Sequence, residues 1–185
     1  MTPPDSERPT GPEVRGELSV KELASADVPR WDAFVDRCPE ATFFHRAQWR
    51  EIIESVFRHR THYLYAERAG NIVGVLPLAH VASRLFGSSL VSLPFCVYGG
   101  AAVTDPAARA ALHSHARELA SSLRVGHLEL RNREIAEPGW LHRDLYATFR
   151  KPLLSDPEAN FEAIPSKRRN MVRRAAKAGL SVVVN

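Results

Sequence analysis

The sequence predicts an α/β protein of the α+β kind, built on a mixed and largely antiparallel sheet that is flanked by helices. Three observations predict this class. Apolar residues recur at helical spacing in the first sixty residues, the period then changes to two, and helix and strand patterns alternate from residue 105 onward. Because 44% of the 185 residues are hydrophobic and 25% are charged, the chain can bury an ordinary globular core.

The first third of the chain predicts one strand and two helices. Residues 1–16 are rich in Pro, Glu, Arg and Ser and have no apolar signal region, so we expect a disordered tail. Alternating residues predict a strand over 17–23. Helices are predicted over 26–38, with Asp27 as the N-cap, and over 45–57, where apolar residues form one stripe.

A β-hairpin is predicted next. Its strands cover 61–68 and 72–81, and the Ala69-Gly70-Asn71 segment supplies the turn. A third strand is predicted over 88–95. It runs into the Gly99-Gly100 pair, which marks a sharp turn or a close approach of the backbone.

The remaining elements alternate between helix and strand. An Asp-Pro pair opens two of the helices, because Asp caps a helix and Pro suits its first position. The predicted elements are a helix over 105–123, strands over 125–132 and 146–154, a helix over 156–164, a basic helix within 166–180, and a strand over 181–185.

Charge and cysteine content exclude several classes. The formal net charge is +4, but residues 166–180 alone carry six positive and no negative charges, which argues for one basic patch and against a general nucleic-acid coat. Cys38 and Cys96 stand in no metal or redox spacing and are interpreted as reduced thiols, with a disulfide left open. The histidines show no metal-ligand spacing. Without an apolar run of about 18 residues, we expect a soluble cytoplasmic protein.

The segment 93–100, Leu-Pro-Phe-Cys-Val-Tyr-Gly-Gly, is a candidate binding loop. Glycines at the end of a buried strand let a ligand or another backbone come close, and Tyr98 could present its hydroxyl at the mouth of a site. The alternative is a tight turn with Tyr98 packed on the surface. A second segment, 84–89, joins two predicted strands and does not open a helix, which favours a polar connection over a phosphate-binding loop.

The basic segment 166–180 has the phasing of an amphipathic helix. At about 100° per residue, Met171, Val172 and three alanines share one arc, and five of the six basic residues lie opposite. We therefore expect a helix packed on one side. Arg168 falls inside the apolar arc, where it needs a carboxylate or an anionic ligand, unless the helix starts later and Arg168 is a loop residue. A solvated face and binding of a phosphate-bearing substrate or tRNA both stay open for the basic arc.

This basic segment, running into a short strand, resembles the hallmark segment of the FemAB-like proteins, a branch of the GNAT acyltransferase fold. The hairpin segment 70–81 and the strand end 93–100 resemble the same group. They are most similar to FemAB-related proteins that accompany exosortase/PEP-CTERM exopolysaccharide systems. The resemblance covers about residues 17–185 and includes no single catalytic signature.

The resemblance implies two tandem GNAT-like domains, the first over 17–164 and a second that begins at 165–185. It implies transfer of an acyl or aminoacyl group to an amine or hydroxyl of a cell-envelope, peptidoglycan-related or exopolysaccharide-related acceptor. The donor substrate would be acyl-CoA or aminoacyl-tRNA, with no tightly bound cofactor. Because such proteins run to about twice this length, the donor domain would be missing and this chain alone inactive. The Arg-Gly-Pro loop of the Fem proteins reads Tyr98-Gly99-Gly100 here, which puts the cell-wall precursor in doubt.

The resemblance also suggests which residues bind substrate. Tyr98, Gly99 and Gly100 would line the acceptor side. Lys167, Arg168, Arg169 and Arg173 would neutralise phosphates of a nucleotide- or lipid-linked acceptor, or of the donor, with tRNA as a further partner. No catalytic residue and no metal ligand is predicted.

Two other classes remain open. A non-catalytic module that binds RNA, DNA or an anionic membrane through the basic helix would show a steep salt dependence of its affinity. A catalytically inactive scaffold of an exopolysaccharide system would fold normally and transfer no acyl group.

Overall fold

The computed structural model describes residues 16–83, 85, 87–133, 139–143, 147–181 and 183. The chain divides into two compact units, Met1–Trp140 and Leu141–Asn185. This division falls earlier in the chain than the predicted boundary between 164 and 165, and the number of domains stays a prediction. The predicted tail lies outside the described residues except for Gly16.

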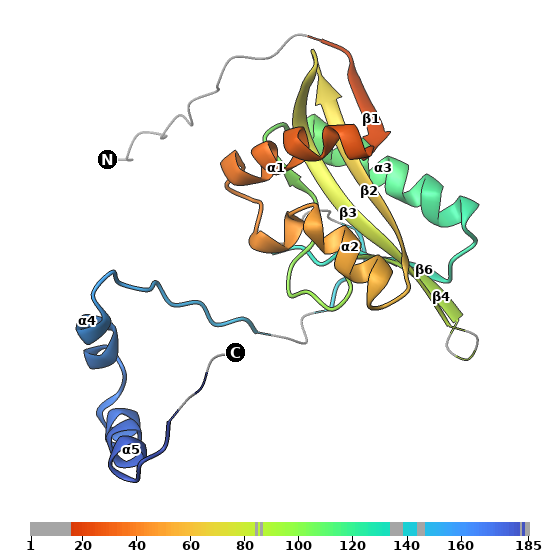
Figure 1. Cartoon of the computed structure of the whole chain (residues 1–185). Helices are drawn as coiled ribbons and strands as arrows, with labels where there is room; N and C mark the ends of the chain where they lie inside the picture. Colours follow the sequence, from red (N-terminus) through yellow and green to blue (C-terminus); the bar gives the residue numbers. More distant parts are fainter. Residues whose placement is uncertain are drawn as a thin grey trace, which may run out of the picture. The chain divides into compact units, whose positions relative to one another are not determined.

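The first unit is a sheet between two layers of helices (Figure 1). Its strands are β1 (Leu18–Glu22), β2 (Arg60–Arg68), β3 (Asn71–Ser83), β4 (Gly87–Ser92), β5 (Ala102–Val103) and β6 (His127–Glu129). The order is β1-β2-β3-β4-β6, with β5 paired to β3. All pairs are antiparallel except β4 and β6, which are parallel. The predicted class, a mixed and largely antiparallel sheet flanked by helices, is confirmed.

Helices cover both faces of this sheet. They are α1 (Val28–Arg37), α2 (Gln48–Ser55) and α3 (Pro106–Ser122), together with the short 3₁₀ helices η1 (Ser25–Asp27) and η2 (Phe43–His45). Tyr63 and Tyr65 of β2 pack with α1 and α2, whereas Leu64 and Ala66, which alternate with them, pack with α3. All four side chains are buried, so β2 is a core strand on both faces.

Two local sequence signals, a turn and a helix cap, have the structures that they predict. Ala69 and Gly70 both have positive φ, 48° and 77°, which suits the tight turn between β2 and β3. Asp105 caps α3, since its Oδ1 accepts a hydrogen bond from the Ala107 N–H at 2.8 Å. The predicted hairpin and the predicted helix over 105–123 are therefore confirmed within a few residues.

β4 and β5 follow one another along the same edge of β3. Ser92 of β4 lies opposite Leu78, and Ala102 of β5 lies opposite Val75. The segment 93–101 between them leaves the sheet and returns to it at a nearby register position. We call this segment the 93–101 loop.

The strand predicted over 88–95 ends earlier, at Ser92. Leu93 and Phe95 have φ values of 47° and 70°, in the left-handed region that extended strands do not use. These two residues turn the chain out of the sheet, so the aromatic and glycine residues that follow belong to a loop.

The second unit contains α4 (Pro157–Glu162) and α5 (Ser166–Lys177). Asp156 caps α4 by accepting a hydrogen bond from the Glu158 N–H at 3.0 Å. The strand predicted over 146–154 is wrong, because residues 147–154 form no ladder, and alternation without a partner strand leaves the backbone groups unpaired. Of the strand predicted over 181–185, Ser181 and Val183 are not in a strand, and the others lie outside the described residues.

The predicted packing of α5 on one side is also wrong. Met171 and Val172 are 64% and 51% exposed, and Arg168 is exposed as well. Because Arg168 stays in solvent, it needs no buried counter-ion. The contacts of α5 with α4 are polar and cationic: Arg169 Nη1 donates to the Glu162 carbonyl at 2.6 Å, and Arg173 lies 5.2 Å from the Phe161 ring centroid. Throughout the described ranges, no helix has the length and apolar character needed to cross a membrane.

Candidate substrate pocket

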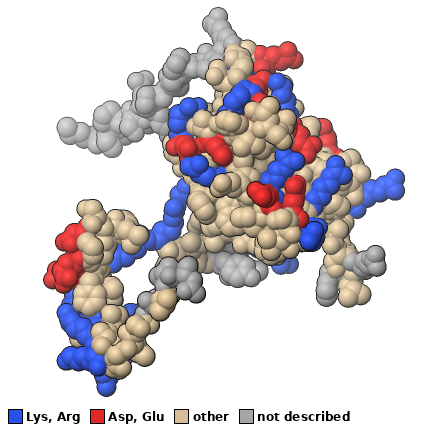
Figure 2. All heavy atoms as spheres, viewed as in Figure 1, with Lys and Arg blue, Asp and Glu red and all other residues tan. Residues whose placement is uncertain are grey.

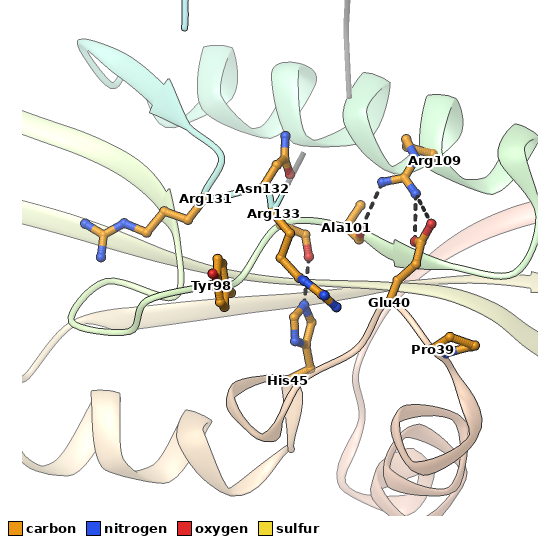
Figure 3. A pocket seen from close by; sticks show the side chains of 10 residues that line it. Pro39, Glu40, His45, Tyr98, Ala101, Arg109, Arg131, Asn132 and Arg133 are labelled. Atoms are coloured by element: carbon orange, nitrogen blue, oxygen red, sulfur yellow. Dashed lines mark hydrogen bonds and ion pairs between the residues drawn. The ribbon is translucent and has the colours of Figure 1, made fainter. Parts of the chain in front are cut away.

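A cavity of about 490 Å³ lies where the two parallel strands end. β4 ends at Ser92 and β6 at Glu129, and the chain after each strand supplies part of the wall (Figure 3). The lining residues are Pro39, Glu40, His45, Tyr98, Gly100, Ala101, Arg109, Arg131, Asn132 and Arg133. In open sheets with parallel strands, ligands bind beyond the carboxyl ends of those strands. The size is also usual for a small-molecule site.

The 93–101 loop is fastened to the chain that follows β6. The N–H groups of Gly99 and Gly100 both donate to the Arg131 carbonyl, each at 3.1 Å. The Arg131 N–H donates to Ser92 Oγ at 2.7 Å, and Arg131 Nη1 donates to the Cys96 carbonyl at 2.9 Å. These bonds hold the 93–101 loop directly against the chain after β6, and neither glycine N–H is free to bind a substrate oxygen.

Both glycines permit close packing of this loop. A Cβ on Gly99 would lie 2.5 Å from Leu93 Cβ, and a Cβ on Gly100 would lie 1.9 Å from Asn132 Oδ1. Such distances are far inside van der Waals contact. A Cβ on Gly99 would also lie 2.9 Å from the Ser92 carbonyl oxygen, and one on Gly100 would lie 3.0 Å from Asn132 Cα, so the predicted close approach of another backbone is present.

His45 ties η2 to the same loop. Its Nδ1 accepts a hydrogen bond from the Thr42 N–H at 3.1 Å, so the proton sits on Nε2, which donates to the Gly100 carbonyl at 2.9 Å. The Trp31 indole donates to the His45 carbonyl at 2.7 Å. Burial lowers the pKa of His45. Because the ring is neutral and both nitrogens are occupied, His45 positions the wall and is not a free base.

Two ion pairs fix other parts of the wall. Arg109 Nη2 contacts both carboxylate oxygens of Glu40, at 2.8 and 2.7 Å, and Arg109 Nη1 donates to the Ala101 carbonyl at 3.0 Å. Glu40 Oε2 also accepts from the Val103 N–H at 2.8 Å, which secures β5. Arg131 Nε pairs with Glu129 at 2.8 Å. These arginines are compensated by carboxylates of the chain.

Arg133 and Tyr98 carry unengaged polar groups of the pocket, and the buried Oδ1 of Asn132 has no hydrogen-bond partner either. The Arg133 guanidinium lies 5.9 Å from the centroid of the Tyr98 ring, in cation–π contact. Within the described part of the chain, no acidic residue pairs with Arg133, and the Tyr98 hydroxyl makes no hydrogen bond. A guanidinium and a phenol are thus available to a ligand.

The predicted substrate-binding residues are divided between the two units. Tyr98 and Gly100 line the pocket, and Gly99 lies in the same turn but packs against Leu93. Lys167, Arg168, Arg169 and Arg173 lie on α5 and are not among the lining residues. Figure 2 shows Lys and Arg side chains gathered over α5, at the lower left.

Eight lining residues were not predicted from the sequence: the apolar Pro39 and Ala101, and the polar Glu40, His45, Arg109, Arg131, Asn132 and Arg133. The Arg-Asn-Arg run at 131–133 could have been singled out as a candidate from the sequence, because it is a polar cluster at the end of a predicted strand. The other positions come from further segments of the chain, and their convergence depends on the tertiary fold.

The N-termini of α2 and α3 do not suit the pyrophosphate of acyl-CoA. Free N–H groups at a helix start are a common cradle for phosphates. At α3 the Asp105 carboxylate occupies this position and pairs with Arg68 at 2.8 Å. At the start of α2 the Ala47 N–H donates to Asp32 at 2.9 Å. A carboxylate at each place repels a second anion. The described residues also contain no cluster of His, Cys, Asp or Glu that could hold a metal ion.

Comparison with known proteins gives weak similarities. No protein-family model and no curated protein matches the chain. A GNAT family acetyltransferase from Staphylococcus aureus is similar with a TM-score of 0.48 and 11% identity, over 74% of this chain and 98% of that one. A predicted acetyltransferase with acetyl-CoA from Clostridium acetobutylicum gives 0.47 and 10%, over 72% and 96%. A transcriptional regulator from Bacillus halodurans gives 0.43 and 10%, over 91% and 96%. At such low scores none of these proteins lends its activity to this chain.

Proposed function

We propose that this chain carries the acceptor-binding part of a GNAT-type, FemAB-like acyl- or aminoacyltransferase. The observation that carries the proposal is the pocket beyond the carboxyl ends of β4 and β6, with Arg133 and Tyr98 unengaged in its wall. The sequence resemblance set out above supports the reaction class. The mixed sheet, with one parallel pair joined through α3, agrees with that class.

The proposed reaction is direct acyl transfer. An amine or hydroxyl of the acceptor attacks the acyl carbon, a new C–N or C–O bond forms, and the bond to the donor's leaving group breaks. The proton of the nucleophile passes to solvent, and the leaving group is protonated. The Tyr98 hydroxyl orients the nucleophile, and most of the rate comes from positioning. Neither His45 nor Glu40 is assigned as a base, because each is held by other groups of the wall.

The donor is proposed to be acyl-CoA or aminoacyl-tRNA, bound away from the N-termini of α2 and α3. Lys167, Arg168, Arg169 and Arg173 of α5 are the proposed phosphate ligands. The acceptor is proposed to be a nucleotide- or lipid-linked precursor related to the cell envelope or to exopolysaccharide. These assignments rest on the sequence resemblance.

Replacement of the Tyr98 hydroxyl tests the pocket's role. Transfer of a labelled acyl group from acyl-CoA and from aminoacyl-tRNA is measured with a panel of amine and hydroxyl acceptors. Tyr98→Phe is expected to lower kcat/KM about tenfold or more, because a positioning hydrogen bond is lost. Tyr65→Phe is the control, since that hydroxyl bonds Asp27 outside the pocket. Equal rates for Tyr98→Phe and the wild type would remove Tyr98 from the site. Because this chain is proposed to carry only the acceptor-binding part, the assay uses a protein that also carries the donor-binding part, and inactivity of that protein with both donors would refute the activity.

A second candidate function has one observation in its favour. The basic residues of α5 form no ion pair with any described residue, and all but Arg169 are exposed. This surface suits a non-catalytic module that binds a polyanion. Such a module would bind single-stranded RNA or duplex DNA with an affinity that falls steeply as salt rises. A flat salt response, or binding unchanged in Lys167→Ala/Arg168→Ala, would exclude it.

A further inference from the structure

We infer that the pocket recognises an anionic group of its ligand, a carboxylate or a phosphate, through Arg133 held over the Tyr98 ring. The inference rests on the proposed function only in taking this ligand to be the acyl acceptor. It adds the chemical class of that acceptor, which must carry an anion close to its nucleophilic amine or hydroxyl.

Among the residues that the structure describes, the charges of the pocket leave one cation uncompensated. Glu40 neutralises Arg109 through two contacts, and Glu129 neutralises Arg131. Arg133 has no such partner among the residues that the structure describes. A guanidinium without a carboxylate in a concave site is suited to an anion from outside, which it can bind through two parallel N–H groups.

The surroundings of Arg133 preserve its charge and limit its motion. The cation–π contact with Tyr98 restricts the orientation of the guanidinium plane while its N–H edges stay available. His45 adds no positive charge to the pocket, because it is buried, neutral and bonded at both nitrogens. The positive field is therefore centred on one side chain, and an acceptor with a single anionic group would balance it.

The backbone beside Arg133 is preorganised. Two residues earlier, the Arg131 carbonyl accepts hydrogen bonds from both Gly99 and Gly100, and the Arg131 N–H is bonded to Ser92. These bonds tie the segment after β6, which leads to Arg133, to the loop that carries Tyr98. Little ordering of the backbone remains for the ligand to induce, which favours binding even of a small anion.

Anion titration of the full chain tests the inference without an acyl donor. Inorganic phosphate, pyrophosphate, acetate and glutarate are titrated at constant ionic strength, set with chloride. Binding is followed by calorimetry and by NMR of the Gly99 and Gly100 amides and the Arg133 Nε–H. We expect saturable shifts at these positions. Phosphate-selective binding would identify a phosphorylated ligand, and carboxylate-selective binding a carboxylated one.

Variants then assign the binding to Arg133. Arg133→Gln is expected to weaken the selected anion about tenfold or more, the usual effect of losing a charged hydrogen bond. Arg133→Lys should recover part of the affinity, because it restores the charge without the planar fork. Arg117→Gln is the matched control, since Arg117 is also exposed and lies 5.9 Å from an aromatic ring, that of Trp140. The control should bind like the wild type.

The outcomes separate this inference from the proposed function. No saturable shift with any of the four anions, or equal loss in Arg133→Gln and Arg117→Gln, would overturn the anion site. Anion binding through Arg133 in a protein that also carries the donor-binding part, and that transfers no acyl group, would keep the site and refute the proposed reaction. Transfer to anionic acceptors at the same kcat/KM in wild type and Arg133→Gln would keep the reaction and refute the acceptor class.

Discussion

The His45 imidazole donates a hydrogen bond from Nε2 to the Gly100 carbonyl at 2.9 Å, with both partners buried. This bond joins η2, near the start of the chain, to the loop that forms one wall of the pocket. Since the opposite ring nitrogen accepts from the Thr42 N–H, one side chain satisfies two backbone groups from distant segments.

Replacing His45 should destabilise the fold. His45→Gln cannot reach both partners and leaves at least one buried backbone group unpaired, so we expect a loss of about 2 kcal/mol in the free energy of unfolding. Urea denaturation followed by circular dichroism measures it. His127→Gln, at an exposed edge position, should change the value by less than about 0.5 kcal/mol. Equal effects of the two replacements would contradict the role given to His45.

Stability should fall on the acid side of neutrality. Burial lowers the pKa values of His45 and His62 below 6.5, so the unfolded chain binds more protons than the folded chain once the pH drops below that value. The full free energy of unfolding is therefore reached above about pH 6.5, where both histidines are neutral in either state. It decreases as the pH falls below this value. Denaturation at a series of pH values checks this, and the His45→Gln variant should show a shallower decrease. A rise in stability on acidification would refute the assignment.

Gly100 should resist substitution for steric reasons alone. Its φ is not positive, but a Cβ would clash with Asn132 Oδ1. We therefore expect Gly100→Ala to lower the free energy of unfolding by about 1–3 kcal/mol. The double variant Gly100→Ala/Asn132→Ala should recover part of this loss, because the blocking amide is gone. Gly126→Ala is the control, since its Cβ would meet only the Ser88 carbonyl at 3.4 Å. Full tolerance of Gly100→Ala in thermal unfolding would mean that the two segments are packed less closely.

The α5 cations should affect substrate binding more than stability. Arg168→Ala/Arg169→Ala is expected to raise KM for the phosphate-bearing donor or acceptor by about tenfold, provided that these residues bind phosphate. Arg150→Ala, an exposed cation of the same unit, is the control. Unchanged KM for both substrates would remove α5 from the site. Because Arg169 also bonds the Glu162 carbonyl, Arg168→Ala alone separates binding from local structure.

Much of the fold could be predicted because the decisive signals are local. Asp105 and Asp156 cap the helices that their Asp-Pro pairs predict, and the Ala69-Gly70 turn sets the hairpin. The errors arise where structure depends on a distant partner. Residues 147–154 alternate as a strand would but have no strand beside them, and Met171 has helical phasing but no covering surface. Periodicity describes one segment and does not supply its neighbour.

The candidate site was predictable only on one wall. Tyr98 and Gly100 could be singled out because a glycine pair after an apolar strand is unusual within a short window. His45, Glu40 and Arg109 belong to segments far away in sequence, and each is an ordinary residue in its own window. Only strand order and the contacts of the helices bring them together.

The position of the 93–101 loop has a consequence for how this protein can change. Ser92 and Ala102 rest on one edge of β3, and that edge stays paired whatever lies between them. Insertions or deletions within the loop can therefore alter the pocket while the ladder and both cores keep their register, since added loop length costs little free energy. The paired strands and the loop between them are therefore separable, and new ligand preferences can evolve in the loop while the sheet stays unchanged.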